Sequence, residues 1–237
     1  MPNASTQVRT TCAASARPLA DYRAWLVDLD GTLYRPLGVK LAMAAELAAL
    51  GWHDIRVIRA FRREHERMRE ALTACRANLS VAEGAPSSSA FEQQIQRTAL
   101  GLAMSEPAVE RTVHRWMFER PGKWLRLFRR RGLIDRIDRY RLQGGRTALV
   151  SDYPATCKLA ALRAAELFEV VIANGERGAA FALKPDPAAY LAAAERLATP
   201  PNDCVVIGDR DDADGQAARA AGMAFCHVKS MVVVPPR

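Results

Sequence analysis

The chain has 237 residues and a formal net charge of +8, and 49% of its residues are hydrophobic. This length allows one large domain or a domain with a smaller insertion, and the composition excludes a globally disordered chain. No apolar run approaches the roughly 18 residues that cross a membrane, so we predict no transmembrane segment. The positive charge favours anionic partners, but it does not distinguish phosphorylated metabolites from nucleic acid or a membrane surface.

The N-terminus and the cysteine pattern both predict a cytoplasmic protein. Residues 1–19 are mostly small and polar, and without a continuous apolar stretch they indicate a flexible tail rather than a signal peptide. A processing segment at this end is an alternative. The five cysteines include no C-x-x-C pair, which favours reduced thiols, and the four histidines lack the spacing of a zinc site.

Short apolar runs rich in Val, Ile and Leu recur in the outer parts of the chain and predict buried parallel strands. They cover residues 24–29, 147–150, 170–173, 204–207 and 224–228. Helical patterns lie between the last four runs, at residues 156–167, 187–197 and 213–221. This alternation of strand and helix predicts an α/β fold with a doubly wound parallel sheet.

The middle of the chain has helical spacing and no convincing strand. The helical patterns cover residues 41–50, 55–72, 91–102 and 109–118. The segment GAPSSS at residues 84–89 predicts a flexible loop within this block. We therefore expect three parts, which are a tail over residues 1–19, a core formed by residues 20–36 plus 120–237, and an inserted helical module over residues 37–119.

Polar residues follow several predicted strands, at the edge of the sheet where their carboxyl ends meet. The first strand runs into DLDGT at residues 28–32, and the second ends at Ser151. The loop before the fourth strand holds Lys184 within KPDP, and the fourth strand runs into GDRDDAD at residues 208–214. Carboxylates, a hydroxyl and an ammonium are thus expected at one rim, and such hard oxygen ligands suit Mg²⁺.

These residue types fit the transfer of a phosphoryl group, which needs a nucleophile, charge neutralisation and a proton donor. Asp28 emerges from a buried strand and is the candidate nucleophile, because a carboxylate can form an aspartyl-phosphate. Asp30 is the candidate general acid and base. Since two adjacent carboxylates repel, we expect one of their pKa values to be raised unless metal charge offsets the repulsion. We expect Ser151 to hydrogen-bond a phosphoryl oxygen, Lys184 to neutralise negative charge, and Asp209 to complete the metal site.

The four ordered motifs resemble those of the haloacid dehalogenase-like (HAD) hydrolase superfamily. The resemblance extends from residue 24 to residue 228 and rests on DLDGT, Ser151, Lys184 in KPDP, and GDRDDAD. It implies a Rossmann-like core, with the helical insertion resembling a C1-type cap that closes over the site. Dehalogenases and phosphonatases depart from aspartate at the position of Asp30, so its presence favours phosphate-ester chemistry.

The resemblance also implies roles for individual residues, with Asp28 as the nucleophile and Asp30 as the general acid and base. The residues implied for Mg²⁺ are the Asp28 carboxylate, the Asp30 backbone carbonyl, Asp209 and Asp214. Asp214 matches the second acidic position of the last motif, which holds metal-bound water or supports Lys184, whereas Asp211 and Asp212 rank below it for this role. The residues implied to bind the substrate phosphate are Thr32, Ser151 and Lys184.

A dense set of arginines and lysines lies between residues 120 and 146, with apolar residues such as Trp124 and Phe128 among them. We interpret this stretch as an amphipathic helix that packs on the core and exposes a basic face. The alternative is contact with an anionic membrane surface, a nucleic acid or a highly phosphorylated substrate.

Together these patterns predict a cytoplasmic, Mg²⁺-dependent phosphatase that hydrolyses a small phosphate monoester through an aspartyl-phosphate. One alternative is a phosphomutase of the same superfamily, which returns the phosphoryl group to an acceptor hydroxyl. The other is a non-catalytic protein that binds a polyanion or a partner on the same fold. We expect a small phosphorylated substrate and no nucleic-acid partner, and we leave peripheral contact with an anionic surface open.

Overall fold

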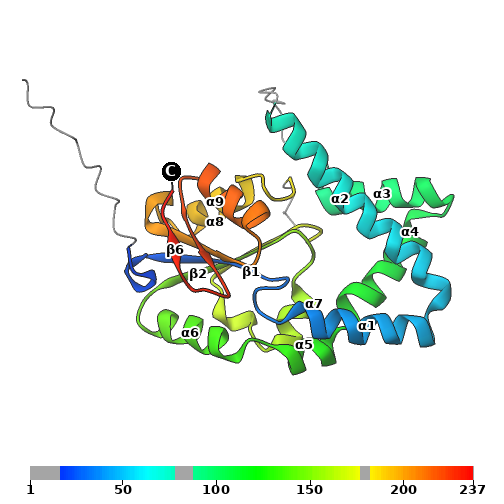
Figure 1. The fold of residues 1–237 in the computed structure, drawn as a ribbon, viewed down its shortest axis with the longest axis horizontal. Helices are drawn as coiled ribbons and strands as arrows, with labels where there is room; N and C mark the ends of the chain where they lie inside the picture. Colours follow the sequence, from blue (N-terminus) through cyan, green and yellow to red (C-terminus); the bar gives the residue numbers. More distant parts are fainter. Residues whose placement is uncertain (1–16, 78–87, 177–181, 237) are drawn as a thin grey trace, which may run out of the picture.

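The computed structural model describes residues 17–77, 88–176 and 182–236 (Figure 1). Within them one sheet has the strand order β3-β2-β1-β4-β5-β6. The strands are β1 (Ala24–Asp28), β2 (Arg146–Ser151), β3 (Val170–Ala173), β4 (Cys204–Gly208), β5 (Ala224–His227) and β6 (Val233–Val234). Strands β1 to β5 run parallel, and β6 pairs antiparallel with β5. The predicted α/β fold is therefore confirmed, and β6 is an addition to the five predicted strands.

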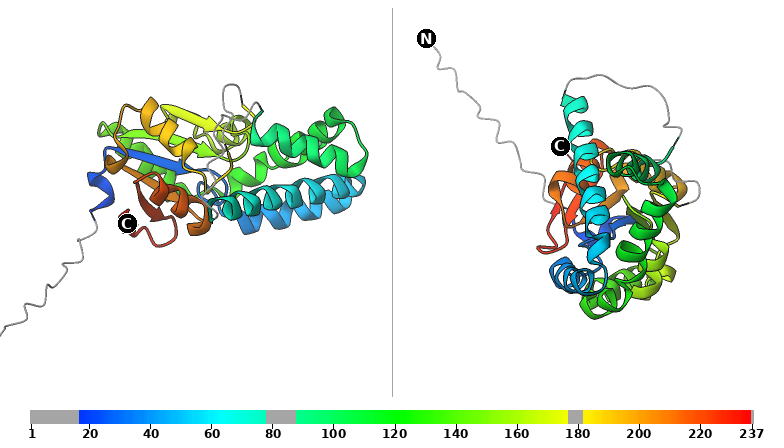
Figure 2. Two further views of the ribbon diagram at one scale, coloured as in Figure 1. Left: turned by 90° about the horizontal axis from the view of Figure 1, so that it is seen from above. Right: turned by 90° about the vertical axis from the view of Figure 1, so that its right-hand side faces the viewer.

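Helices cover both faces of the sheet (Figures 1 and 2). The longer helices of this part are α6 (Arg131–Leu142), α7 (Thr156–Leu162), α8 (Ala188–Arg196) and α9 (Gln216–Ala220). Short segments accompany them, namely η1 (Leu19–Asp21), η4 (Ala165–Leu167), η5 (Pro201–Asp203) and the π-helical η6 (Asp211–Gly215). The helix predicted over residues 156–167 is interrupted because Arg163 adopts a left-handed φ of 54°, which ends α7.

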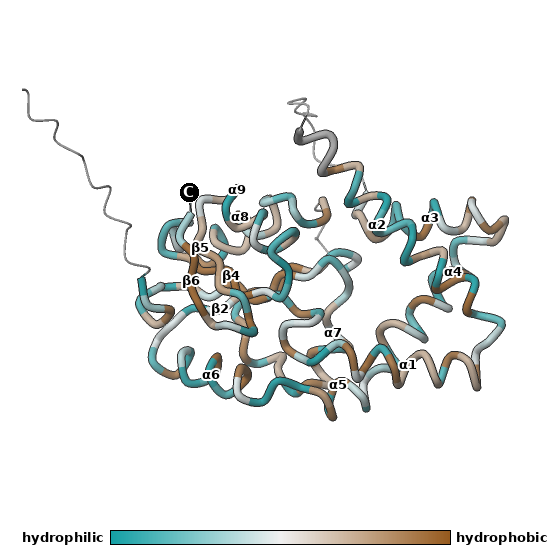
Figure 3. The backbone as a smooth tube through the Cα atoms, in the orientation of Figure 1, coloured by the Kyte–Doolittle hydropathy of each residue, from teal (hydrophilic) through white to brown (hydrophobic). Residues whose placement is uncertain are grey.

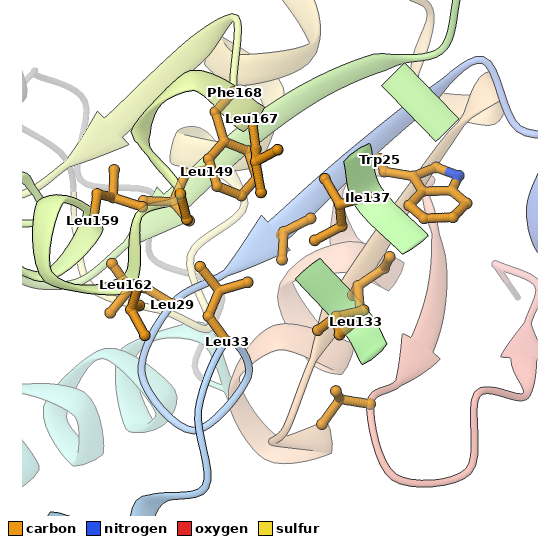
Figure 4. Close-up of a cluster of buried hydrophobic side chains, with 14 of the residues drawn as sticks. Trp25, Leu29, Leu33, Leu133, Ile137, Leu149, Leu159, Leu162, Leu167 and Phe168 are labelled. Atoms are coloured by element: carbon orange, nitrogen blue, oxygen red, sulfur yellow. The ribbon is translucent and has the colours of Figure 1, made fainter. Parts of the chain in front are cut away.

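Buried apolar residues alternate along β1 between the two faces of the sheet. Trp25 and Val27 belong to the cluster under α6 and α7, whereas Leu26 belongs to the cluster under α8 and α9. Figure 4 shows part of the first cluster, and the Trp25 ring stacks on that of Tyr140 with centroids 4.0 Å apart. Because β1 is buried on both faces and paired on both sides, the residue at its end, Asp28, has a fixed position.

The segment between β1 and α6 consists, in its described residues, of helices joined by turns and of an isolated bridge between Tyr34 and Arg129. Its elements are α1 (Pro36–Leu50), η2 (Trp52–Asp54), α2 (Ile55–Ala77), α3 (Ala90–Leu102), α4 (Glu106–Val113), the π-helical η3 (His114–Glu119) and α5 (Gly122–Phe128). Helices α1 to α4 lie to one side of the sheet (Figures 1 and 2), and α2, α3 and α4 pack on one another around their own apolar cluster. Since α1 also packs against α5, the division at residues 37 and 119 stays a prediction.

Two predicted flexible segments fall mainly outside the described residues. Of the tail predicted over residues 1–19, only the end is described, and there Leu19 begins η1 and its carbonyl accepts a hydrogen bond from Trp25. Of the loop predicted at residues 84–89, only Ser88 and Ser89 are described, and Ser89 is the N-cap of α3. Its Oγ accepts a hydrogen bond from the Glu92 amide at 3.2 Å, and the Glu92 carboxylate accepts one from the Ser89 amide.

The basic stretch forms two helices rather than one, because the backbone is extended at Arg129 between α5 and α6. Helix α6 buries Leu133, Ile137 and Tyr140 against the sheet, and most of its remaining positions are arginine or aspartate, which gives the mixed hydropathy of this helix in Figure 3. The interpretation as an amphipathic packing element is therefore confirmed. Among the described residues no helix combines the length and the apolar composition of a membrane span.

Candidate active site

The strand order places the carboxyl ends of β2, β1 and β4 next to one another. From β1 the chain moves outward to β2 and β3 in one direction and to β4 and β5 in the other, so β1 lies at a topological switch point, where ligands bind in open α/β sheets. Asp28 pairs with Val150, and Val27 pairs with Ile207. The residues that follow these partners, Ser151 and Gly208, therefore reach the same rim as Asp28.

Lys184 joins two of the predicted carboxylates in the interior. Its Nζ lies 2.5 Å from Asp28 Oδ1, 2.8 Å from Asp214 Oδ1 and 3.1 Å from the Val150 carbonyl. The side chains of Lys184, Asp28 and Asp214 are all buried, and the Tyr190 hydroxyl of α8 also donates to Asp214 Oδ1, at 2.8 Å. The three protons of the ammonium thus have three acceptors, which a buried lysine requires.

The charges of this cluster do not balance. Burial raises the pKa of Asp28 well above its ordinary value, the neighbouring Asp214 raises it further, and Lys184 only partly opposes this. Burial alone lowers the pKa of Lys184, but the carboxylates of Asp214 and Asp28 outweigh it and raise that pKa well above its usual range. Both directions follow from one ammonium facing two or more carboxylates in a region of low dielectric constant.

Asp209 adds a third carboxylate to the cluster. Oxygen atoms of Asp28, Asp209 and Asp214 all lie within 4.8 Å of one another. Burial and the nearby Asp214 raise the pKa of Asp209 above its ordinary value. Gly31 lies against this carboxylate with a φ of +96°, and a Cβ there would overlap the Asp209 side chain. Clustered hard oxygen donors with surplus negative charge fit a divalent cation.

Asp30 lies in a different environment, with an ammonium of its own. Lys158 Nζ lies 2.6 Å from both Asp30 Oδ1 and Asp30 Oδ2, and the Tyr34 hydroxyl donates to Oδ1 at 2.6 Å. Burial acts to raise the pKa of Asp30, but the Lys158 ammonium outweighs it, so that the pKa is lowered. One aspartate of the pair thus has a raised pKa, as expected, but the main causes are burial of Asp28 and the charge of Asp214.

The two predicted phosphate-binding hydroxyls are both buried. Ser151 Oγ accepts a hydrogen bond from the Tyr153 amide at 3.1 Å, and nothing within the described part of the chain hydrogen-bonds Thr32 Oγ1. Asp152 Oδ1 accepts a hydrogen bond from the Lys184 amide at 3.1 Å and so fixes the backbone of that residue. The sequence does not indicate this contact, because Asp152 and Lys184 are 32 residues apart in the chain and meet only in the folded structure.

The acidic residues of the last motif separate into one buried and two exposed positions. Asp214 is in the cluster, whereas Asp211 pairs with Arg219 at 3.0 Å on the surface. Asp212 binds Arg210 at 2.7 Å and also Arg69 of α2 at 3.0 Å, and hydrogen bonding to Arg210 lowers its pKa to about 2. Among these three, only Asp214 lies with Asp28 and Asp209.

The model of the haloacid dehalogenase-like hydrolase family matches residues 22–222. The chain therefore belongs to this family. It is 37% identical over 99 residues to a phosphoglycolate phosphatase of Nitrosospira multiformis, a match that spans 40% of this chain and 42% of that protein. It is 60% identical over 40 residues to a phosphoglycolate phosphatase of Xylella fastidiosa, covering 17% of each. The chain thus spans less than half the length of these curated relatives.

Solved structures of similar fold include members of the same superfamily. An L-2-haloacid dehalogenase from Xanthobacter autotrophicus has a TM-score of 0.56 and 16% identity, with 87% of this chain and 77% of that chain covered. The HAD hydrolase YfnB from Bacillus subtilis has a TM-score of 0.55 and 15% identity, with 90% and 92% covered. These likenesses confirm the Rossmann-like α/β fold.

Proposed function

We propose that the protein is a Mg²⁺-dependent phosphatase that hydrolyses a small phosphate monoester through an aspartyl-phosphate on Asp28. The observation that carries this proposal is the buried cluster at the end of β1. There Asp28 contacts Lys184, and its carboxylate lies with those of Asp209 and Asp214. A positioned carboxylate, an ammonium and an acidic metal site are the parts that phosphoryl transfer through an aspartate needs.

Mg²⁺ would be held by the carboxylates of Asp28, Asp209 and Asp214 together with the backbone carbonyl of Asp30. When bound, it would supply the positive charge that this cluster lacks and reduce repulsion between the nucleophile and the substrate phosphate. Lys184, which pairs with both Asp28 and Asp214, neutralises part of the same charge. The excess of carboxylates over ammonium groups supports this proposed requirement for a cation.

In the first step an Asp28 oxygen attacks phosphorus, and the bond from phosphorus to the leaving oxygen breaks while Asp30 protonates that oxygen. In the second step water attacks the same phosphorus and Asp30 takes a proton from it, which regenerates Asp28. Thr32 and Ser151 hydrogen-bond the phosphoryl oxygens. The buried Thr32 hydroxyl, which has no partner among the described residues, supports its part in this role.

The first metabolite to test is 2-phosphoglycolate, because the matched relatives from Nitrosospira multiformis and Xylella fastidiosa bear the name phosphoglycolate phosphatase. A small anionic substrate is consistent with the net charge of +8. A cytoplasmic location and the absence of a nucleic-acid partner remain predictions from the sequence.

The proposal is tested by release of inorganic phosphate from an aryl phosphate and from a panel of phosphorylated metabolites. The protein is assayed with Mg²⁺ and with a chelator, as wild type and as Asp28→Asn. Asp211→Asn is the matched control, since it removes a carboxylate that is outside the cluster. We expect turnover that needs Mg²⁺, survives Asp211→Asn and is lost in Asp28→Asn. Metal-independent turnover, or turnover that persists in Asp28→Asn, would overturn the proposal.

A further inference from the structure

Lys158 is a buried lysine that the mechanism above does not use. It lies in the first turn of α7 and is only 4% exposed, although lysine is seldom buried without a partner. Its ammonium contacts both carboxylate oxygens of Asp30 at 2.6 Å. A buried charge that meets one functional carboxylate in this way needs an explanation beyond packing.

Two aromatic rings flank this ammonium in addition to Asp30. Lys158 Nζ lies 5.3 Å from the ring centroid of Phe118 in η3 and 5.6 Å from that of Tyr153 in the loop after β2. The faces of aromatic rings attract a cation at such distances. Because Lys158 is buried between these rings and Asp30, it meets Asp30 as a buried donor rather than as a surface charge.

The contacts of Asp30 define one orientation of its carboxylate. Oδ1 accepts from Tyr34 and from Lys158, and Oδ2 accepts from Lys158. Every one of these contacts uses Asp30 as an acceptor, which is what its base form offers. The Asp30 side chain still keeps 29% of its surface exposed, so a water molecule can approach the carboxylate while the donors hold it.

We propose that Lys158 and Tyr34 are positioning residues that hold the Asp30 carboxylate as the base for hydrolysis of the aspartyl-phosphate. The inference rests on the proposed phosphatase function. In that step the bond from the water oxygen to phosphorus forms, and the bond from phosphorus to the Asp28 oxygen breaks. Its electron pair returns to the Asp28 carboxylate. One water proton passes to Asp30, and hydrogen phosphate leaves.

This assignment makes the two halves of the reaction unequal. Formation of the aspartyl-phosphate from p-nitrophenyl phosphate needs little proton donation, because its leaving group is a weak base. Hydrolysis of the aspartyl-phosphate needs the base whichever substrate was used. Loss of Lys158 should therefore slow the second half and spare the first. A merely structural role would instead damage substrate binding and both halves together.

The test compares Lys158→Met, Lys158→Arg and Tyr34→Phe with wild type on p-nitrophenyl phosphate in the presence of Mg²⁺. Tyr34→Phe removes a single hydroxyl and guards against a folding defect in the lysine variants. Lys40→Met is the matched control, since Lys40 is an exposed lysine on α1. Steady-state constants are measured together with the rapid release of p-nitrophenol in the first turnover.

In Lys158→Met we expect kcat to fall by about 10- to 100-fold while kcat/KM stays within about twofold, so that KM falls with kcat. A stoichiometric burst of p-nitrophenol should precede the slow turnover, because the aspartyl-phosphate accumulates. Tyr34→Phe should show the same pattern more weakly, Lys158→Arg should restore part of kcat, and Lys40→Met should match wild type.

Equal losses in kcat and kcat/KM without a burst, in Lys158→Met and Tyr34→Phe alike, would overturn the inference while leaving the phosphatase intact. Unchanged kcat in both variants would overturn it as well. An inactive wild type would contradict the proposed function, and the inference would fall with it. The wild-type assay thus separates failure of the positioning role from failure of the phosphatase.

Discussion

The two acidic regions of the candidate site differ in charge balance. Around Asp28, three carboxylates share the single ammonium of Lys184, and burial raises the pKa of Asp28. Around Asp30, one carboxylate receives an ammonium and a phenol hydroxyl, and its pKa is lowered. The first region lacks positive charge, which supports the proposed cation site, whereas in the second Lys158 and Tyr34 keep the Asp30 carboxylate ionised, which supports the positioning that we propose for it.

The largest effect on stability is expected from Lys184→Met. This change leaves Asp28 and Asp214 buried without their ammonium, and breaking a buried pair in this way costs about 3–5 kcal/mol. The free energy of unfolding, measured with urea in the absence of divalent cations, should fall accordingly. Lys40→Met, at an exposed position, should change it little. An equally stable Lys184→Met would show that the ammonium does not balance this cluster.

A divalent cation should stabilise the first region and not the second. If Mg²⁺ binds the folded protein at the Asp28 cluster, a concentration 100 times its Kd raises the free energy of unfolding by about 2.7 kcal/mol. The gain should be seen in the wild type and in Asp211→Asn by thermal unfolding. Asp209→Asn should reduce or remove it, because one of the three clustered carboxylates is lost. Equal stabilisation of all three proteins would place the ion elsewhere.

Gly31→Ala should combine backbone strain with a collision at Asp209. A non-glycine residue at the φ of +96° costs about 1–3 kcal/mol, and the new Cβ would overlap the Asp209 carboxylate. Gly144→Ala is the matched control, since Gly144 has a φ of +87° and nothing lies within 4 Å of the place that its new Cβ would take. Both variants should lose stability in urea unfolding, but only Gly31→Ala should also weaken Mg²⁺ binding. Equal metal affinity in the two variants would contradict the contact.

The smallest effect is expected at His65 of α2, outside both acidic regions. Burial lowers the pKa of His65 despite the opposing influence of Asp152 and of its contact with Gln94. The unfolded chain therefore binds a proton at His65 more readily than the folded chain does. The contribution of neutral His65 to the free energy of unfolding should be fully present above about pH 6.5, the pKa of an unfolded histidine. It should be lost as the pH falls through the lower pKa of His65 in the folded protein. His65→Gln should lose less stability over this window, and parallel pH profiles would contradict the prediction.

Most of the sheet and the order of the site motifs could be predicted from the sequence. Apolar runs bounded by turn residues identify β1 to β5, because strands buried on both faces must be apolar throughout. The two-residue strand β6 is too short for any such pattern. The helix predicted over residues 156–167 breaks at Arg163 because the backbone of that residue is left-handed. Arginine rarely adopts this conformation, so the sequence does not indicate the break.

The partners of the site residues were harder to predict than the residues themselves. Asp28, Asp209, Asp214 and Lys184 follow strands, so the geometry of a parallel sheet brings them to one rim. Lys158 and Tyr190 lie on helices, where a lysine is usually exposed and a tyrosine usually belongs to the core. Their contacts with Asp30 and Asp214 arise only when the helices pack on the sheet.

If Asp28 carries the phosphoryl group, as we propose, the most direct measurement is to trap that group on it. Wild-type protein is mixed with substrate and Mg²⁺, quenched in acid within the first turnover, digested and examined by mass spectrometry. Lys158→Met, in which the second step should be slow, is treated in the same way. We predict a phosphorylated peptide that contains residue 28 and is absent from Asp28→Asn. A phosphoryl group on another residue, or turnover of wild type and Lys158→Met without any phosphorylated peptide, would contradict the account.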